Sequence, residues 1–68
     1  MFDKDVYSQH HLNRYLRFIE SCKHQVIEGF CEEHHIKPRS LGGQDTFDNL
    51  VKLTYRQHFI AHLMLSKI

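Results

Sequence analysis

Four of the seven histidines in this chain lie between residues 34 and 62. They form an adjacent pair, His34 and His35, and a second pair, His58 and His62, whose members are four positions apart. The second pair falls in a segment with a helical pattern, and residues four apart on a helix lie on the same face. Two such imidazoles can bind one metal ion if the first pair folds back to supply a third ligand. The sequence therefore predicts a strand that ends at the first pair and lies over a helix carrying the second.

Three imidazole ligands would leave one histidine of the adjacent pair beside the ion but not bound to it. Imidazole titrates near neutral pH, so such a histidine is suited to act as a general base. Three protein ligands also leave coordination positions open, as in catalytic rather than closed structural sites. Strict alternation along a strand would send His34 and His35 to opposite faces. Both can serve one site only if the strand ends, twists or bulges there.

An N-terminal helix is predicted over residues 8–24, where apolar residues recur at spacings of three and four. The apolar stripe consists of Leu12, Tyr15, Leu16, Ile19 and Cys22. Ser8, or Asp5 or Asp3 one turn earlier, is the expected N-cap. Charged side chains fill the opposite side, so we expect this helix to be a scaffold whose apolar stripe packs on the later elements.

Two short strands are predicted over residues 30–36 and 50–53, joined by a long loop. Pro38 removes a backbone donor and stops strand pairing. The loop after it is rich in turn residues, and Gly42 and Gly43 are expected to permit positive φ. A loop this long in a small domain is expected to be functional or to be tied down.

The final helix is predicted to begin after Thr54, with Gln57 completing a capping box, and to run to Ile68 because no stop signal precedes it. Its apolar residues cover most directions apart from the stripe formed by His58 and His62. We therefore expect it to be sandwiched between the hairpin and the N-terminal helix.

Taken in order, these motifs closely resemble the HNH (ββα-metal) nucleases, in the four-histidine form of colicin-type DNases and phage homing endonucleases. The motifs are Glu32-Glu33-His34-His35-Ile36-Lys37-Pro38, the Gly42-Gly43 pair, Asn49, His58 and His62. The resemblance covers roughly residues 29–65. It implies an α+β fold in which two short antiparallel strands with a long loop and a metal-binding helix pack on the N-terminal helix. A single domain is expected, with residues 1–28 as the scaffold helix and residues 29–68 as the nuclease motif.

The resemblance also implies a role for each site residue. The metal ligands would be His34, His58 and His62. His35 would be the general base, and Asn49 would brace the loop. Glu32 would be the carboxylate that orients a metal-binding histidine, with Glu33 as the alternative. Cleavage of a phosphodiester needs a base to deprotonate water and a cation to stabilise developing charge, which this division supplies. Arg39 and Arg56 could hold phosphate oxygens, or could be solvated surface charges.

The implied activity is that of a metal-dependent DNA endonuclease of the phage homing type; a restriction, packaging-associated or toxin DNase is the runner-up. One divalent ion is expected. Imidazole ligands favour Zn²⁺ or Ni²⁺, whereas the working ion in the cell could be Mn²⁺ or Mg²⁺. The competing class is a zinc-stabilised binding module in which all four histidines close a structural site.

The net charge of +1 is low for a chain that binds a polyanion. Basic residues do cluster around the proposed site, namely Lys37, Arg39, Lys52 and Arg56. DNA is therefore the expected partner, contacted mostly at its backbone, with further affinity from another specificity domain or a second protomer. Arg14 and Arg17 on the scaffold helix are further candidates for backbone contacts.

Two cysteines, Cys22 and Cys31, show no Cys-x-x-Cys spacing, and the first residues do not resemble a signal sequence. Free thiols are expected, with a disulfide as the alternative. No apolar run approaches the length of a membrane span. We expect an intracellular protein, in the cytoplasm of the host cell if a phage encodes it.

Overall fold

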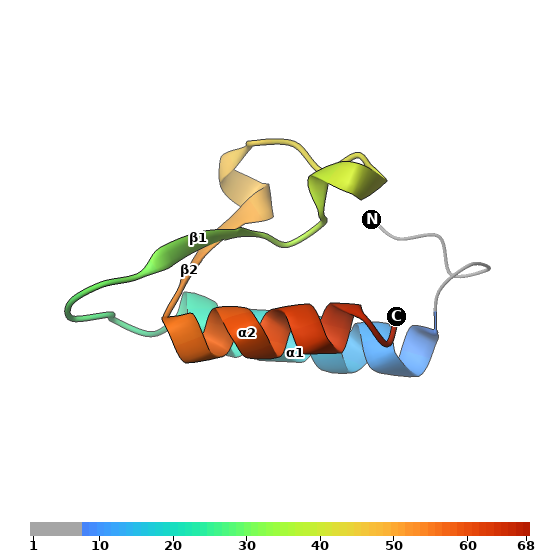
Figure 1. Ribbon diagram of the computed structural model, residues 1–68, viewed down its shortest axis with the longest axis horizontal. Helices are drawn as coiled ribbons and strands as arrows, with labels where there is room; N and C mark the ends of the chain where they lie inside the picture. The colour runs from blue at the N-terminus through green and yellow to red at the C-terminus, as the bar shows by residue number, and fades with distance from the viewer. Residues whose placement is uncertain (1–7) are drawn as a thin grey trace.

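A computed structural model describes residues 8–68. The elements are α1 (Gln9–Lys23), β1 (Glu32–His35), two 3-10 turns η1 (Arg39–Leu41) and η2 (Phe47–Asn49), β2 (Leu50–Leu53) and α2 (Tyr55–Leu65). The β1–β2 hairpin lies over one side of the two helices, which run side by side in opposite directions (Figure 1). This arrangement confirms the predicted α+β fold.

Helix α1 begins where the sequence indicated. The Oγ atom of Ser8 accepts a hydrogen bond of 3.4 Å from the backbone N–H of His11, as an N-cap residue does. The alternative caps, Asp3 and Asp5, lie outside the described residues. Four members of the predicted apolar stripe are buried in the core: Leu12, Tyr15, Ile19 and Cys22. The stripe thus faces the hairpin and α2, as expected for a scaffold helix.

The two strands pair antiparallel, with Glu32 opposite Leu53 and His35 opposite Leu50. Strand β1 is shorter than the predicted 30–36, since the paired register runs from Glu32 to His35. Beyond it the backbone N–H of Ile36 still donates to the carbonyl of Asn49 at 2.8 Å. His34 is buried and Glu33 is exposed, so the alternation of a strand persists up to this point. The buried face of the hairpin is the one that covers the helices.

Helix α2 begins with the predicted capping box: Thr54 accepts from the backbone of Gln57, whose side chain in turn accepts from the backbone N–H of Thr54. The prediction that α2 runs to Ile68 was wrong, since the helix ends at Leu65. The hydroxyl of Ser66 donates to the carbonyl of Leu63, a local bond of the kind that competes with helix continuation.

The expectation that α2 is sandwiched between the hairpin and α1 holds only in part, because α2 contacts both but keeps apolar residues exposed. Phe59 and Leu63 are 66% and 50% exposed, and only Ala61 of this helix is fully buried. The hairpin and α1 together cover one side of α2 and leave an apolar strip in solvent. Within residues 8–68, neither helix combines the length and apolar character that crossing a bilayer requires.

Candidate metal centre

Three imidazoles converge where the hairpin meets α2. One nitrogen from each of His34, His58 and His62 lies within 4.8 Å of the other two. The Nε2 atoms of His58 and His62 are 3.2 Å apart, as expected for residues one helical turn apart on the same face. His34 reaches them from β1, with its ring centroid 5.1 Å and 5.4 Å from theirs. Three nitrogens this close form a donor set suited to one transition-metal ion.

The strand histidine is the buried member of the cluster. His34 is 3% exposed, whereas His62 is exposed and His58 is intermediate. Burial, reinforced by His58 and His62, lowers the pKa of His34 to about 4. At neutral pH this ring is therefore uncharged, which is the form that binds a metal ion.

Glu32 lies beside the cluster and contacts one of its members. Its Oε1 atom is 2.9 Å from Nδ1 of His58. A carboxylate can only accept, so in the neutral imidazole this contact places the hydrogen of His58 on Nδ1 and leaves a lone pair on Nε2, the nitrogen near His62. This is the geometry expected of a carboxylate that orients a metal-binding histidine.

His35 is not a member of the three-imidazole cluster. Its Nε2 atom is 2.6 Å from Oδ1 of Asp45, in the loop between the strands. Arg39 donates to the same carboxylate, and its guanidinium, followed by His35, holds the pKa of Asp45 below its usual value. The adjacent histidines thus have separate partners, His34 among the imidazoles and His35 in the loop.

Asn49 ties the loop to the end of β1, as its position suggested. Its Oδ1 accepts from the backbone N–H of Lys37 at 2.8 Å, and its Nδ2 donates to the carbonyls of Lys37 and Gln44 at 3.1 and 2.9 Å. The side chain is 8% exposed. The nearly buried amide of Asn49 therefore makes three hydrogen bonds, all to backbone groups of the loop at Lys37 and Gln44.

The two loop glycines are needed for different reasons. Gly42 has φ +92, in the left-handed region, as predicted. Gly43 does not have positive φ, so the prediction was wrong for this residue. A Cβ at Gly43 would lie 1.7 Å from the carbonyl oxygen of Lys37, so glycine is required here by close approach of two backbone segments.

The two arginines proposed to hold phosphate differ in their surroundings. Arg39 is exposed but already paired with Asp45. Arg56 is exposed on the first turn of α2, and no ion pair to it occurs among residues 8–68. Arg39 would have to give up Asp45 to hold another anion, whereas Arg56 has no such partner among the described residues.

Two residues with polar contacts at this site were not identified from the sequence. Asp45 was one turn residue among many in the loop, and no spacing marked it. Tyr15 was assigned to the apolar stripe of α1, yet its hydroxyl lies 2.7 Å from Nε2 of His34. Burial raises the pKa of Tyr15, so the hydroxyl stays protonated.

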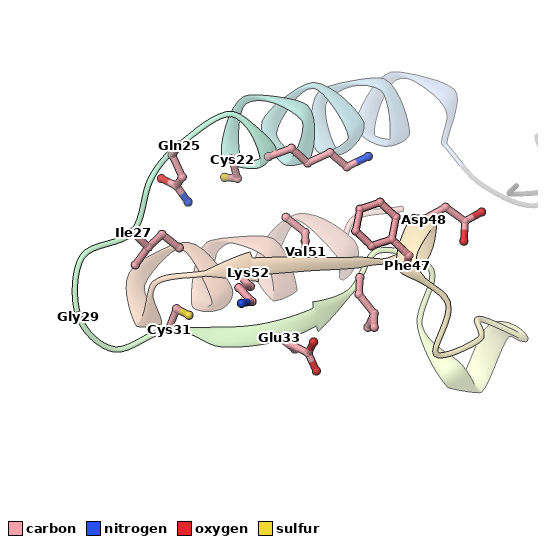
Figure 2. A pocket seen from close by; sticks show the side chains of 12 residues that line it. Cys22, Gln25, Ile27, Gly29, Cys31, Glu33, Phe47, Asp48, Val51 and Lys52 are labelled. Carbon is pink, nitrogen blue, oxygen red and sulfur yellow. The ribbon is translucent and has the colours of Figure 1, made fainter.

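A hollow with a different lining opens elsewhere on the described residues. It has a volume of about 850 Å³ and opens between the end of α1 and the hairpin, with Phe47 at one end (Figure 2). Cys22 and Cys31 line it, and both thiols are free. None of the four site histidines lines this hollow. The hollow is therefore separate from the imidazole cluster, in which His34 is buried and His62 is exposed.

Comparison with known proteins identifies similar sequences. Residues 20–56 match a family described as HNH endonuclease. The chain is 65% identical over 44 residues to "Probable mobile endonuclease E" of Enterobacteria phage T4, an alignment covering 65% of the chain and 31% of that relative. It is 48% identical over 59 residues to "Probable mobile endonuclease C" of the same phage, covering 79% of the chain and 28% of the relative. The chain thus spans less than a third of either relative's length. No solved structure gave a significant match.

Proposed function

The chain belongs to the HNH endonuclease family, and on this premise we propose that it is a metal-dependent endonuclease that hydrolyses DNA phosphodiester bonds. The single observation that carries the proposal is the separation of the adjacent histidines. His34 joins His58 and His62 within 4.8 Å, while His35 is held outside that set by Asp45. One three-nitrogen cluster and one independent imidazole are what a metal ion and a general base require.

His34, His58 and His62 would hold one divalent ion. When bound, the ion would stabilise negative charge on the phosphate and on the departing 3′ oxygen. The imidazole donor set favours Zn²⁺ or Ni²⁺ over Mg²⁺ in a purified sample, with Mn²⁺ or Mg²⁺ as candidates for the working ion. Glu32 supports the set through His58, because it keeps the proton on Nδ1 and the lone pair on Nε2.

His35 would take the proton from the attacking water. The carboxylate of Asp45 can only accept, so the hydrogen on Nε2 of His35 points to Asp45 and Nδ1 carries the lone pair. Asn49 fixes the loop that bears Asp45, through its bonds to Lys37 and Gln44. The loop therefore sets both the tautomer and the direction of the base.

DNA is the proposed substrate, and we propose that contacts are made mostly to its backbone. The net charge of +1 gives little long-range attraction, so local cations such as Arg56 and the bound ion must contribute. The relatives' names, which describe mobile endonucleases of a phage, favour a homing-type enzyme over a restriction, packaging-associated or toxin DNase. A specificity region in a longer protein, or a second protomer, would supply sequence recognition.

The test is to incubate supercoiled plasmid with the chelator-treated chain and a series of added divalent ions. We expect nicked or linear DNA with at least one ion and none with chelator alone. Metal titration by calorimetry should find one tight site per chain, and binding should raise the melting temperature, since binding free energy adds to folding free energy in so small a domain. Tight metal binding without cleavage under any ion would instead support a zinc-stabilised binding module.

A further inference from the structure

Tyr15 is a fully buried tyrosine whose hydroxyl contacts two polar groups. One is the imidazole of His34 in β1, and the other is the carbonyl of Ile36, directly after β1. The oxygen lies 2.7 Å from Nε2 of His34 and 2.7 Å from the carbonyl oxygen of Ile36. The side chain is 0% exposed, and α1 carries it beneath the hairpin. The hydroxyl therefore has these two partners and no access to solvent.

The hydroxyl has one hydrogen, and its partners determine where that hydrogen points. The carbonyl of Ile36 can only accept, so the Tyr15 hydroxyl donates to it. The remaining contact, with His34, then requires that Nε2 carry a hydrogen and donate to the hydroxyl oxygen. The opposite assignment would place two oxygen acceptors 2.7 Å apart with no hydrogen between them, which is costly in a buried site.

We propose that Tyr15 is a positioning residue of the metal centre, which holds His34 in the tautomer protonated on Nε2 so that Nδ1 is the nitrogen offered to the ion. A neutral imidazole has a single N–H, so fixing it on one nitrogen fixes the lone pair on the other. This inference rests on the proposed function in one respect, that the imidazole cluster binds a metal ion.

A hydrogen-bond partner also determines the tautomer of His58, but there the hydrogen lies on the other ring nitrogen. Glu32 fixes the hydrogen of His58 on Nδ1, so His58 offers Nε2. The ion would therefore meet different nitrogens of the strand and helix histidines, each set by its own hydrogen-bond partner. Helix α1 then becomes part of the metal centre through one hydroxyl, although none of its residues is a ligand.

The first measurement uses the wild-type chain. Nitrogen NMR of the chelator-treated protein should report His34 as the Nε2–H tautomer, and after loading with NMR-active cadmium the scalar coupling should appear at Nδ1 of His34 and Nε2 of His58. Coupling at Nε2 of His34, or an Nδ1–H tautomer in the metal-free protein, would overturn the proposal. Absence of cadmium coupling to any histidine would overturn the metal centre as well. Normal coupling with no DNA cleavage would count against the nuclease function alone.

The second measurement compares Tyr15→Phe with Tyr55→Phe, a control at a tyrosine that is 60% exposed. Tyr15→Phe keeps the ring but removes the hydroxyl, so His34 should show a mixture of tautomers and zinc affinity should fall roughly 10- to 100-fold. Tyr55→Phe should change neither quantity. A role of Tyr15 in core packing alone would leave the tautomer unchanged, and that result would refute the proposal. If Tyr15→Phe does not fold, the wild-type coupling pattern still decides.

Discussion

Glu32 and His58 are 26 residues apart in sequence, yet Oε1 of the strand glutamate accepts a hydrogen bond of 2.9 Å from Nδ1 of the helix histidine. The bond joins the hairpin to α2 at the edge of the imidazole cluster. It also explains why the first and second acidic residues of the Glu32-Glu33 pair are not equivalent. Glu32 faces the cluster, whereas Glu33 is exposed on the other side of the strand.

The first prediction uses that difference. Glu32→Ala should lower zinc affinity roughly 10- to 100-fold, because His58 loses the acceptor that fixes its tautomer. Glu33→Ala removes the same charge from the neighbouring position and should change affinity by less than about twofold. Calorimetric titration of the two variants makes the comparison. Equal losses would mean that the carboxylates act only through overall charge.

The second prediction concerns the loop brace. Asn49→Ala removes three hydrogen bonds from an 8% exposed side chain and leaves backbone groups of Lys37 and Gln44 without partners. At about 0.5–1.5 kcal/mol for each bond, the free energy of unfolding should fall by about 2–4 kcal/mol. Asn13→Ala, on the exposed side of α1, should change it by less than about 0.5 kcal/mol. Urea denaturation measures both, and a loss at Asn49 no larger than at Asn13 would contradict the bracing role.

The parts of the site that the sequence predicted are those set by short-range geometry. A spacing of four positions on a helix brings His58 and His62 to one face, whatever the rest of the chain does. Thr54 and Gln57 mark the start of this helix through local hydrogen bonds to the backbone. Asn49 could be assigned from the resemblance alone. The antiparallel hairpin could also be predicted, because a third histidine could reach the helix only if its segment folded back over it.

The parts that the sequence did not predict depend on contacts between segments far apart in the chain. The apolar stripe predicts that the ring of Tyr15 is buried. It does not predict which group the hydroxyl contacts, so His34 could not be identified as its partner. Asp45 is one turn residue among several, and only the folded loop brings it to His35. The burial of α2 was overestimated for the same reason. An apolar side chain such as Phe59 can be buried by a neighbouring segment, but its presence does not show that any segment of this chain covers it.

The third prediction tests the loop carboxylate. The amide of Asp45→Asn can present its N–H₂ donor instead of its oxygen to His35, so the tautomer of the base is no longer fixed. The cleavage rate should then fall about tenfold or more, which is a smaller loss than removal of the His35 imidazole would cause. Metal affinity should stay within about twofold, because Asp45 does not contact the three clustered histidines. Asp48→Asn, an exposed acid of the same loop, is the control. A large loss of metal affinity in Asp45→Asn would place this residue in the ion site instead.

The fourth prediction uses the two free thiols. Cys22 is 4% exposed, and burial raises its pKa, so little reactive thiolate forms. Cys31 is half-buried at the start of the hairpin. Iodoacetamide at neutral pH should therefore alkylate Cys31 at least about tenfold faster than Cys22, as followed by mass spectrometry of peptides. In denaturant the two rates should converge, and faster reaction at Cys22 in the folded chain would show that α1 does not pack as described.

The fifth prediction separates the four histidines by role. His58→Ala and His62→Ala should each lower metal affinity and cleavage together, because two protein ligands remain in place of three. His34→Ala should behave alike, although its ring comes from the strand.

His35→Ala differs because its ring is bonded to Asp45 and lies outside the cluster. This variant should retain metal affinity within about twofold, while the cleavage rate falls on the order of 10²- to 10⁴-fold, the usual contribution of a general base. Metal titration beside plasmid cleavage for all four variants is the measurement. Loss of metal binding in His35→Ala with retention in His34→Ala would reverse the assignment of the adjacent pair. Cleavage unaffected by all four substitutions would mean that the imidazole cluster is not the active site, because no base and no ion-binding group would then have been removed from the reaction.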